Sequence, residues 1–341
     1  FLRRDMKVLL YFEAQKQIAQ SGIGRAMKHQ INALESNGIE YTLDPKDEYD
    51  ILHINTVGFN SERIIKDARR KNVPVIYHAH STEEDFRNSF IFSNALAPLF
   101  KKRITKLYSS ADLIITPTAY SKKLIQNYGI KNEIINISNG IDLERFEPNA
   151  MKVEKFKSFF KIAEGEKVVF GVGLYFERKG ILDFIEVARK TPNVKFIWFG
   201  HTNKFLVQKK IKKAIKNAPK NVIFPGYIKG DIIEGAFLGA NLFFFPSHEE
   251  TEGIVVLEAL AAKQQVLIRD IGVYEDWLTD GVDCYKGNGV EEFTNIIVDI
   301  LNGKNNSTQE EGYKVATTLT VDKVGKKLVE SYRRILEKYE W

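Results

Sequence analysis

The sequence predicts an α/β protein with two doubly wound, Rossmann-like domains of similar size. Short apolar runs alternate with amphipathic helical segments, and this plan occurs twice along the 341 residues. That length suits two domains of ordinary size. A charged stretch at residues 147–166 lacks a strand signal and is the predicted linker, which sets domains of 6–149 and 150–320.

The predicted elements follow this plan in order. In the first half we expect strands at 7–12, 40–42, 51–54, 73–78, 113–116 and 133–137, with helices at 24–37, 61–71, 95–109 and 119–127. In the second half we expect strands at 168–173, 195–200, 222–225, 242–246 and 265–269, with helices at 178–190, 204–217, 231–238 and 253–262. A last amphipathic helix at about 321–341 is expected to pack back onto the first domain. Doubly wound sheets bind ligands at the carboxyl ends of their strands, and two such sheets facing each other would enclose a central cleft.

Composition narrows the class of protein. A single cysteine, Cys284, excludes a disulfide framework and a Cys-rich zinc site and fits a reducing cytosol. No signal peptide and no apolar run of about 20 residues is apparent. The net charge of +6 is local, because residues 204–220 hold seven lysines and no acid. Such a patch suits an anionic partner, or it is an ordinary solvated helix face.

Three segments carry candidate chemistry, and the first is the weakest. Gly22 and Gly24 follow the first strand and open a helix, where small residues let a ligand approach the backbone. Met27 stands where a dinucleotide fingerprint requires a third glycine, which argues against NAD. A plain strand-to-helix turn remains the alternative.

The second and third segments are more informative. Gly173 ends a strand, and Arg178 and Lys179 stand at the start of the next helix, which gives a diphosphate a forked donor, a point charge and free amides. Glu250 and Glu258 are eight residues apart around the start of another helix. A carboxylate on an apolar helix is costly to bury unless it binds something, and a ribose diol would suit it. The alternatives are a solvated turn for the first segment and a helix cap for Glu250.

With these segments in view, the chain resembles a retaining glycosyltransferase of the GT-B class, family 4. The matching residues are Gly22-Ile23-Gly24, residues 111–118, Asn139-Gly140-Ile141-Asp142, Gly173 with Arg178-Lys179-Gly180, and Glu250 with Glu258 around residues 253–259. They run through almost the whole chain in family order. The resemblance makes the first domain the acceptor-binding domain and the second the nucleotide-sugar-binding domain.

The resemblance also implies residue roles. Catalytic roles fall to His80, Glu250, Arg178 and Lys179, with the cations on the donor diphosphate, Glu250 near the transferred sugar and His80 beside it. Glu258 would hold the ribose, backbone at Tyr227 and Ile228 would read the base, and Gly22, Gly24, Gly173, Gly253, Ile254 and Val255 would complete the donor site. One departure is Leu174, where the family often has an arginine; Arg178 or Arg25 is the expected replacement. His78 and His80 also suit a metal, but no third ligand appears at metal spacing, so we expect no metal and no cofactor.

The acceptor is inferred from the segment after His80. Phe86, Arg87, Phe90 and Phe92 lie in an apolar stretch, and the helix after it carries Lys101, Lys102 and Lys106 away from an apolar face. This pattern suits an anionic membrane surface, and the alternative is that the apolar face packs in the domain core. Residues 78–89 resemble the acceptor side of bacterial enzymes that add a second hexose to monoglucosyl-diacylglycerol. The glycolipids that such enzymes make anchor lipoteichoic acid in Gram-positive bacteria.

The sequence therefore predicts a cytoplasmic, peripheral membrane hexosyltransferase. Its substrates would be UDP-glucose or UDP-galactose and a diacylglycerol glycolipid, with no nucleic acid partner. Three alternatives remain: a family-4 transferase with a soluble or polyprenyl-linked acceptor, a UDP-sugar epimerase, and a basic module without catalytic activity.

Overall fold

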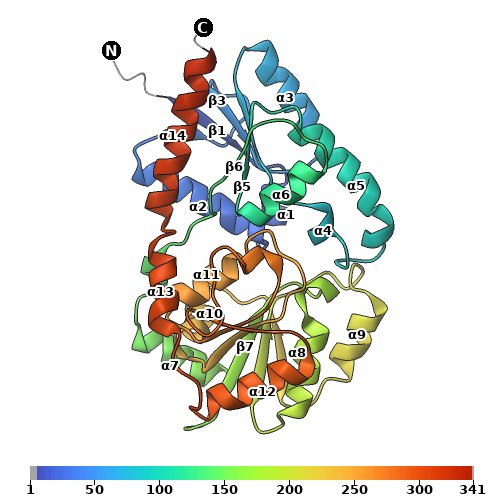
Figure 1. Cartoon of the computed structure of the whole chain (residues 1–341), viewed down its shortest axis with the longest axis vertical. Coiled ribbons are helices and arrows are strands. Elements are labelled where there is room, and N and C mark those ends of the chain that lie inside the picture. The colour runs from blue at the N-terminus through green and yellow to red at the C-terminus, as the bar shows by residue number, and fades with distance from the viewer. Residues whose placement is uncertain (1–5, 340–341) are drawn as a thin grey trace. The chain divides into compact units, whose positions relative to one another are not determined.

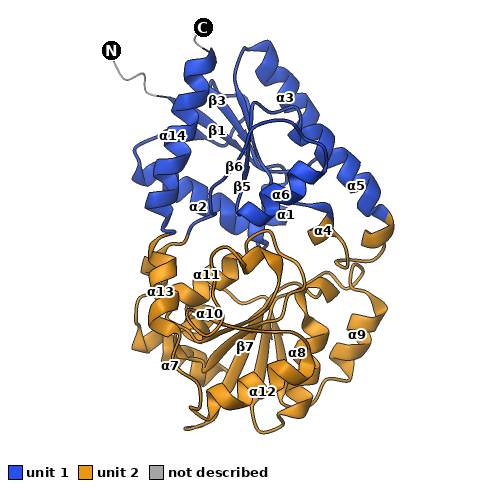
Figure 2. Ribbon diagram, in the orientation of Figure 1, with its two compact units in different colours: residues 1–83, 96–140, 319–341 blue, residues 84–95, 141–318 orange. Residues whose placement is uncertain are grey.

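The computed structural model describes residues 6–339 and contains two compact units, each built on a parallel sheet (Figure 1). Within these residues, unit 1 comprises 6–83, 96–140 and 319–339, and unit 2 comprises 84–95 and 141–318 (Figure 2). Residues 1–5, which precede the predicted first domain, lie outside the described residues. The predicted α/β class with two Rossmann-like sheets is confirmed.

Unit 1 contains a six-stranded sheet in the order β2-β1-β3-β4-β5-β6, with all pairs parallel. Its strands are β1 (Lys7–Tyr11), β2 (Glu40–Thr42), β3 (Ile51–Ile54), β4 (Val75–His78), β5 (Leu113–Thr116) and β6 (Ile134–Asn136). The helices that accompany them are α1 (Gln15–Ile18), α2 (Gly22–Ser36), α3 (Ser61–Arg70), α4 (Glu83–Phe86), α5 (Ser93–Tyr108) and α6 (Ala119–Asn127). The sheet separates two apolar clusters, because the strands are buried on both faces.

The last helix, α14 (Val321–Tyr339), also belongs to unit 1 and packs on α2. Val324, Leu328 and Tyr332 enter the same cluster as β1. A close approach at Gly325 allows this packing, since a Cβ there would lie 2.4 Å from the carbonyl oxygen of Ala33.

Unit 2 has the strand order β12-β11-β10-β7-β8-β9, again all parallel. Its strands are β7 (Val168–Val172), β8 (Lys195–Phe199), β9 (Val222–Gly226), β10 (Leu242–Phe245), β11 (Val266–Arg269) and β12 (Tyr285–Gly287). Its helices are α7 (Ala150–Phe159), α8 (Ile181–Lys190), α9 (Lys209–Lys216), α10 (Asp231–Gly239), α11 (Ile254–Ala261), α12 (Val290–Leu301) and α13 (Gln309–Thr317), with 3₁₀ turns at Leu143–Phe146, Glu177–Lys179 and Gly272–Tyr274.

Residues 270–320 had no predicted element but contain β12, α12 and α13, and two further segments differ from the sequence expectation. The predicted linker at 147–166 is wrong for its central part, which forms α7 and packs on α10 through buried Phe156 and Gly235. Residues 84–95, which precede the predicted boundary at residue 149, lie with unit 2. They are held there because the Arg178 amide donates to Asn88 O at 2.8 Å and the Ile91 amide donates to Leu206 O at 3.0 Å.

Candidate functional site

The site begins where the strand order of unit 2 reverses. β7 and β10 are neighbours, β8 and β9 extend the sheet on one side, and β11 and β12 extend it on the other. Loops leaving the carboxyl ends of strands at such a switch point form the usual ligand crevice of this sheet type. The loops here are 173–180 after β7 and 246–253 after β10, the two segments that the sequence singled out.

These two loops are locked together through their backbones. Gly180 has φ of +78°, and a Cβ there would lie 2.2 Å from the Pro246 carbonyl oxygen, so only glycine fits. The His248 amide donates to the Arg178 carbonyl oxygen at 2.7 Å. The loop after β7 is therefore fixed against the loop after β10, and their side chains converge.

Lys179 and Glu250 form the centre of the site. Lys179 Nζ donates to Glu250 Oε1 at 2.6 Å, and Ser247 Oγ donates to the same oxygen at 2.6 Å. Arg178 lies 3.7 Å from that oxygen and donates to the Glu249 carbonyl oxygen at 3.0 Å. Both Arg178 and Glu250 are buried. The structure thus brings together three of the four residues predicted to be catalytic.

Arg178 is also held by residues 84–95. Its Nε donates to Ser89 Oγ at 3.2 Å, and Ser89 is buried. Sequence reasoning missed Ser89 as a support for this arginine, because 89 residues separate the two. No spacing signal reports a contact of that range.

The charges of this cluster shift its titration. Burial raises the pKa of Glu250, but Lys179 and Arg178 outweigh it and hold that pKa below its ordinary value. Burial lowers the pKa of Lys179, and Glu250 opposes the shift only in part. Glu250 is therefore held in its ionised form between the side chains of Lys179 and Arg178.

Glu258 is buried on α11, as its apolar neighbours predicted, at 1% exposure. Arg145 approaches it to 3.5 Å and also contacts Glu234 at 3.3 Å. Arg145 thus supplies an opposite charge to this buried carboxylate in the free protein, and the ribose contact that the resemblance assigns to Glu258 stays a prediction. Arg145 lies near the end of the predicted first domain, and no motif marks it.

The amino end of α11 offers a second set of donors. Gly253 has φ of +89° and precedes Ile254 and Val255, whose amides open the helix. A Cβ on Gly253 would lie 3.1 Å from Tyr274 Oη. Within residues 6–339 that buried hydroxyl has no hydrogen-bond partner, so it can donate to an anion bound at the helix end. Tyr274 was not predicted, since nothing in its local sequence marks it.

Four further donor-site candidates in unit 2 follow the strands β7 and β9. Gly173 packs against Trp198, whose Nε1 donates to the Gly173 carbonyl oxygen at 2.9 Å, and a Cβ would lie 3.1 Å from the ring. Leu174 is partly exposed beside it. Tyr227 and Ile228 follow β9, with Tyr227 exposed. All four lie at the carboxyl edge of the unit 2 sheet.

Two predicted donor-site glycines and one predicted catalytic residue belong to unit 1. Gly22 and Gly24 open α2, and a Cβ on Gly24 would lie 2.4 Å from the Ile18 carbonyl oxygen, so Gly24 is required for packing on α1. A Cβ on Gly22 would meet nothing within 4 Å. His80 follows β4 and is partly exposed.

His80 belongs to a row of three histidines. The rings of His78 and His80 stack with centroids 4.2 Å apart. His53 Nε2 lies 3.0 Å from His78 Nδ1, and His53 Nδ1 lies 2.6 Å from Tyr332 Oη on α14. Burial lowers the pKa of His53 and of His80 to about 3, and the pKa of His78 also lies well below its ordinary value. All three rings are neutral at physiological pH.

The hydrogen bonds assign the tautomers of this row. Gln30 Nε2 lies 3.3 Å from His78 Nδ1 and can only donate, so His78 Nδ1 is an acceptor and His53 donates to it from Nε2. His53 Nδ1 therefore accepts the proton of Tyr332, which is fully buried. His78 is therefore protonated on Nε2, a buried atom without a hydrogen-bond partner within residues 6–339.

The hydrogen bond with Asn55 determines the tautomer of His80, the last ring of the row. Asn55 Oδ1 accepts from Gln30 Nε2 at 2.6 Å and faces His80 Nε2 at 2.8 Å, so that His80 nitrogen carries the proton. His80 is thereby left with a lone pair on Nδ1. A hydroxyl that approaches this atom would meet a neutral hydrogen-bond acceptor.

The predicted acceptor-side residues divide between two environments. Phe86 and Phe90 pack edge to face at 5.2 Å and, like Arg87, are partly exposed, whereas Phe92 is 77% exposed. On α5, Lys101 pairs with Glu83 at 3.1 Å and Lys106 pairs with Glu62 at 3.2 Å, and Lys102 is exposed.

The apolar face of α5 is only partly available to a membrane, because part of it packs in the domain core as the alternative interpretation expected. Ile104 and Leu107 are buried in the core of unit 1, whereas Leu96 and Leu99 near the start of the helix are exposed. The core-packing alternative thus holds for the second half of the face.

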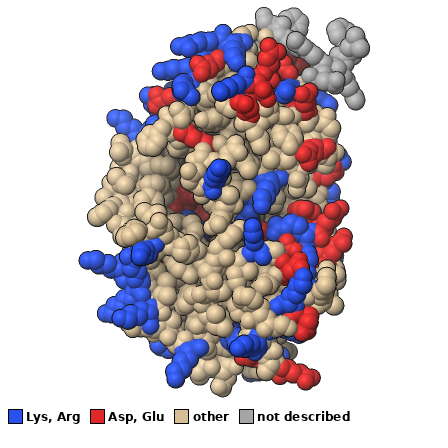
Figure 3. Space-filling view, turned by 180° about the vertical axis from the view of Figure 1, so that it is seen from behind, with Lys and Arg blue, Asp and Glu red and all other residues tan. Residues whose placement is uncertain are grey.

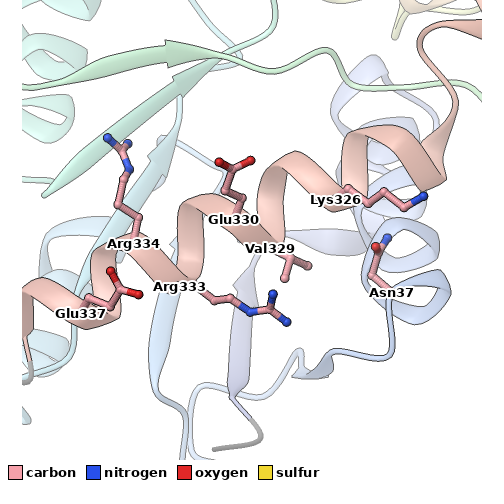
Figure 4. Close-up of a pocket in the computed structure, with 7 residues that line it drawn as sticks. All are labelled: Asn37, Lys326, Val329, Glu330, Arg333, Arg334 and Glu337. Atoms are coloured by element: carbon pink, nitrogen blue, oxygen red, sulfur yellow. The ribbon is translucent and has the colours of Figure 1, made fainter. Parts of the chain in front are cut away.

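Other features of residues 6–339 add no competing site. A surface hollow of about 550 Å³ on unit 1 lies along α14, with Lys326 extending toward Asn37 of α2 (Figure 4). Its cations Lys326, Arg333 and Arg334 alternate with Glu330 and Glu337, so it favours neither sign of ligand charge. In this part of the chain, no set of three or more His, Cys, Asp or Glu side chains is grouped to hold a metal ion. None of its helices combines the length and apolar character needed to cross a bilayer.

Comparison with known proteins agrees with this geometry. Residues 152–315 match the family model for glycosyl transferases group 1, and residues 42–145 match the model for glycosyltransferase family 4. The chain is 50% identical to a processive diacylglycerol alpha-glucosyltransferase of Acholeplasma laidlawii, over 97% of this chain and 99% of that protein. It is 22% identical to an alpha-galactosylglucosyldiacylglycerol synthase of Streptococcus pneumoniae, over 80% of this chain and 75% of that one.

Among solved structures, the Anabaena protein HepE in complex with UDP and glucose superposes with a TM-score of 0.77 at 17% identity, covering 96% of this chain and all of that one. The two parallel sheets, with paired cations and acids at a strand-order switch, define a glycosyltransferase of the GT-B fold. The near-complete match at 50% identity shows that the chain belongs to glycosyltransferase family 4.

Proposed function

We propose that the protein transfers glucose from UDP-glucose to monoglucosyl-diacylglycerol and retains the α-configuration of the donor. The observation that carries the proposal is the cluster of Lys179, Arg178 and Glu250 at the switch point of unit 2, in a chain that matches a diacylglycerol alpha-glucosyltransferase along nearly its whole length. The name of the Acholeplasma relative favours glucose over galactose, although the Streptococcus relative is named for galactosyl transfer.

The chemistry assigns a task to each side of the cluster. Departure of UDP leaves negative charge on the diphosphate, and Lys179, Arg178 and the amides after Gly253 are placed to stabilise it. Glu250 would exchange its contact with Lys179 for a hydroxyl of the transferred glucose. The proposal includes no metal or cofactor, because two cations and a helix end supply the positive charge.

The acceptor side rests on the relatives and on the exposed apolar residues after His80. A lipid acceptor remains in the bilayer, so the enzyme would work as a peripheral protein at the inner face of the cell membrane. The dihexosyl product is the type of glycolipid that anchors lipoteichoic acid in Gram-positive bacteria, and we include that role in the proposal.

The direct test is product formation. The full chain is incubated with UDP-glucose or UDP-galactose and with monoglucosyl-diacylglycerol or diacylglycerol in detergent micelles. We expect UDP release and a dihexosyl lipid whose new linkage is α by NMR. Release of UDP at background rate with every lipid, together with turnover of a saccharide or polyprenyl-linked acceptor, would contradict the proposal. Conversion of the UDP-sugar without UDP release would indicate an epimerase.

A second test addresses Glu258 by itself. Glu258→Gln should weaken UDP binding about 10- to 100-fold, the effect of losing a charged hydrogen bond to the ribose. Glu234→Gln is the matched control, because Glu234 contacts the same Arg145. Equal UDP affinity in both variants, measured by calorimetry, would remove Glu258 from the donor site and favour a non-catalytic module.

A further inference from the structure

Unit 2 carries a surface that its nucleotide site does not use. Phe205 is 74% exposed and Leu206 is 48% exposed in the loop between β8 and α9. Phe92, which is 77% exposed, joins them, because its neighbour Ile91 donates its amide to the Leu206 carbonyl oxygen at 3.0 Å. Three large apolar side chains therefore project from two segments that meet through their backbones. We call Phe92, Phe205 and Leu206 the apolar tip.

Lysines border the apolar tip. Lys204 Nζ lies 5.2 Å from the centre of the Phe205 ring, and α9 follows directly. The inner face of α9 is anchored by Ile211, which is fully buried, so its lysines face outward. Figure 3 shows Lys and Arg side chains gathered on the edge of unit 2 that carries α9, which is the left edge in that view.

These lysines are largely unneutralised. Lys210 pairs with Glu177 at 2.5 Å. Among the residues that the structure describes, no salt bridge involves the exposed lysines of the same helix, Lys209, Lys212, Lys213 and Lys216. An unpaired cationic face attracts an anionic surface, and each lysine near such a membrane adds to the attraction.

From this arrangement we infer that the apolar tip and the lysines of α9 dock unit 2 onto an anionic lipid bilayer. The apolar side chains would enter the boundary between headgroups and acyl chains while the lysines contact lipid phosphates. A nucleic acid explains the lysines but gives no role to the exposed aliphatic side chain of Leu206 beside Phe205, so the bilayer is the favoured partner. This surface differs from the lysines of α5, and the inference rests on the proposed function in that its acceptor is a lipid.

The position of the surface matters for the donor site. Residues 84–95 carry Phe92 at one end, while Asn88 and Ser89 hold Arg178 at 2.8 Å and 3.2 Å. A bilayer that receives the apolar tip would therefore lie within a few residues of a segment that holds Arg178, which is proposed to contact the leaving diphosphate.

The test compares vesicle binding of the full chain and its variants. The vesicles are phosphatidylcholine alone or equal parts phosphatidylcholine and phosphatidylglycerol, and binding is measured by sedimentation. Phe205→Ser/Leu206→Ser should weaken binding to the anionic vesicles on the order of tenfold or more. Lys209→Gln/Lys213→Gln should weaken it several-fold and reduce its dependence on salt.

The controls lie on other surfaces. Phe59→Ser removes an almost fully exposed phenylalanine from unit 1, and Lys123→Gln/Lys131→Gln removes two exposed lysines there; neither should alter vesicle binding. The apolar-tip and α9 variants should keep UDP affinity and transfer to micellar acceptor, which reports on the proposed function separately.

The outcomes separate the two ideas. Unchanged vesicle binding in both variants, with normal micellar transfer, overturns the docking surface and leaves the proposed function standing. Absence of transfer in the unaltered protein overturns the proposed function instead. Binding to a random DNA duplex that the lysine variant loses, with no binding to either vesicle, overturns the bilayer as partner.

Discussion

Lys179 and Glu250 show how single residues prepare the donor site. A buried lysine without a partner would tend to lose its proton, and Glu250 opposes this loss before any donor binds. Ser247 fixes the glutamate in turn through a hydrogen bond of 2.6 Å. The free protein thus keeps a cation charged and aimed at the place where a diphosphate is proposed to bind.

The first prediction concerns the pH dependence of UDP binding. Because burial holds the pKa of Lys179 below its ordinary value of 10.5, the lysine loses its charge at lower pH than a free lysine does. UDP affinity should therefore begin to fall as pH rises, before the ordinary lysine range is reached. Titration calorimetry on the alkaline side measures this decline.

Lys179→Arg is the control for this prediction, because arginine stays charged throughout that range. The variant should show a flat affinity profile even if its affinity is lower. A decline of equal steepness in Lys179→Arg would assign the titration to another group.

The second prediction concerns His80, whose free Nδ1 is an acceptor in this hydrogen-bond pattern. If asparagine replaces His80, its side-chain amide lies near the former position of His80 Nδ1, whereas the amide of a glutamine lies near the former position of Nε2. His80→Gln should therefore keep the contact with Asn55 and lower kcat about three- to tenfold, the effect of one lost neutral hydrogen bond. His80→Asn should retain more of kcat.

Steady-state transfer assays on both variants check the order of these effects. UDP affinity should stay constant in both, since the proposed diphosphate contacts belong to unit 2. A larger loss in His80→Asn than in His80→Gln would show that Nε2, not Nδ1, acts on the substrate.

At this scale the sequence predicted the residues that follow local rules. Lys179 and Glu250 were singled out because each stands at a strand-to-helix junction, and Glu258 because it follows Glu250 by eight residues within an apolar helix. Tyr274, Arg145 and Ser89 were missed, because each reaches the site from a distant segment. Their contacts depend on chain packing, which spacing does not report.

Among the secondary-structure elements, periodicity predicted most strands and helices, including α14 between residues 321 and 339. It failed for α7, whose ten residues hold three lysines and a glutamate around the buried Phe156. It also gave no element between residues 270 and 320, where β12, α12 and α13 lie. Packing against α10 stabilises α7, and a single sequence does not show such a partner.

The third prediction tests the packing of α14 on α2. Gly325→Ala adds a Cβ that would lie 2.4 Å from the Ala33 carbonyl oxygen, a backbone atom that cannot rotate away. Overpacking of this kind costs about 1–3 kcal/mol, which exceeds the helix propensity that alanine adds. The midpoint of thermal unfolding should fall by about 2–8 °C.

Gly22→Ala is the matched control, because Gly22 is also helical and its Cβ would meet nothing within 4 Å. That variant should unfold at the original temperature or slightly above it. A stabilised Gly325→Ala would show that the two helices separate without cost.

For the whole molecule, chain order and spatial order differ in both units. Residues 84–95 leave the first sheet to support Arg178 in unit 2, and the last helix returns to unit 1. The amphipathic pattern of residues 321–339 suggested this return. Tyr332 gives it a chemical consequence, since α14 ends the histidine row that begins at His80.

The last prediction follows from that row. An unfolded histidine binds a proton below about pH 6.5, but folded His53 does not do so until about pH 3, because burial lowers its pKa. His78 shifts in the same direction. Acid therefore favours the unfolded state of unit 1. The stability is fully present above about pH 6.5 and should fall by about 1.4 kcal/mol per pH unit for each of these two histidines as pH falls.

Hydrogen exchange of β3 and β4 between about pH 7 and 5 measures this loss, because carboxylates of an unfolded chain titrate mainly below that window. The amides of β7 and β10 in the same protein are the control, and their protection should fall less steeply. His53→Gln should flatten the decline of stability with falling pH in unit 1, since glutamine takes up no proton.

Tyr332→Phe should lower the free energy of unfolding by about 1–3 kcal/mol, because it leaves His53 Nδ1 buried without its donor. Equal loss of protection in both units on acidification would mean that the histidine row does not govern the acid response.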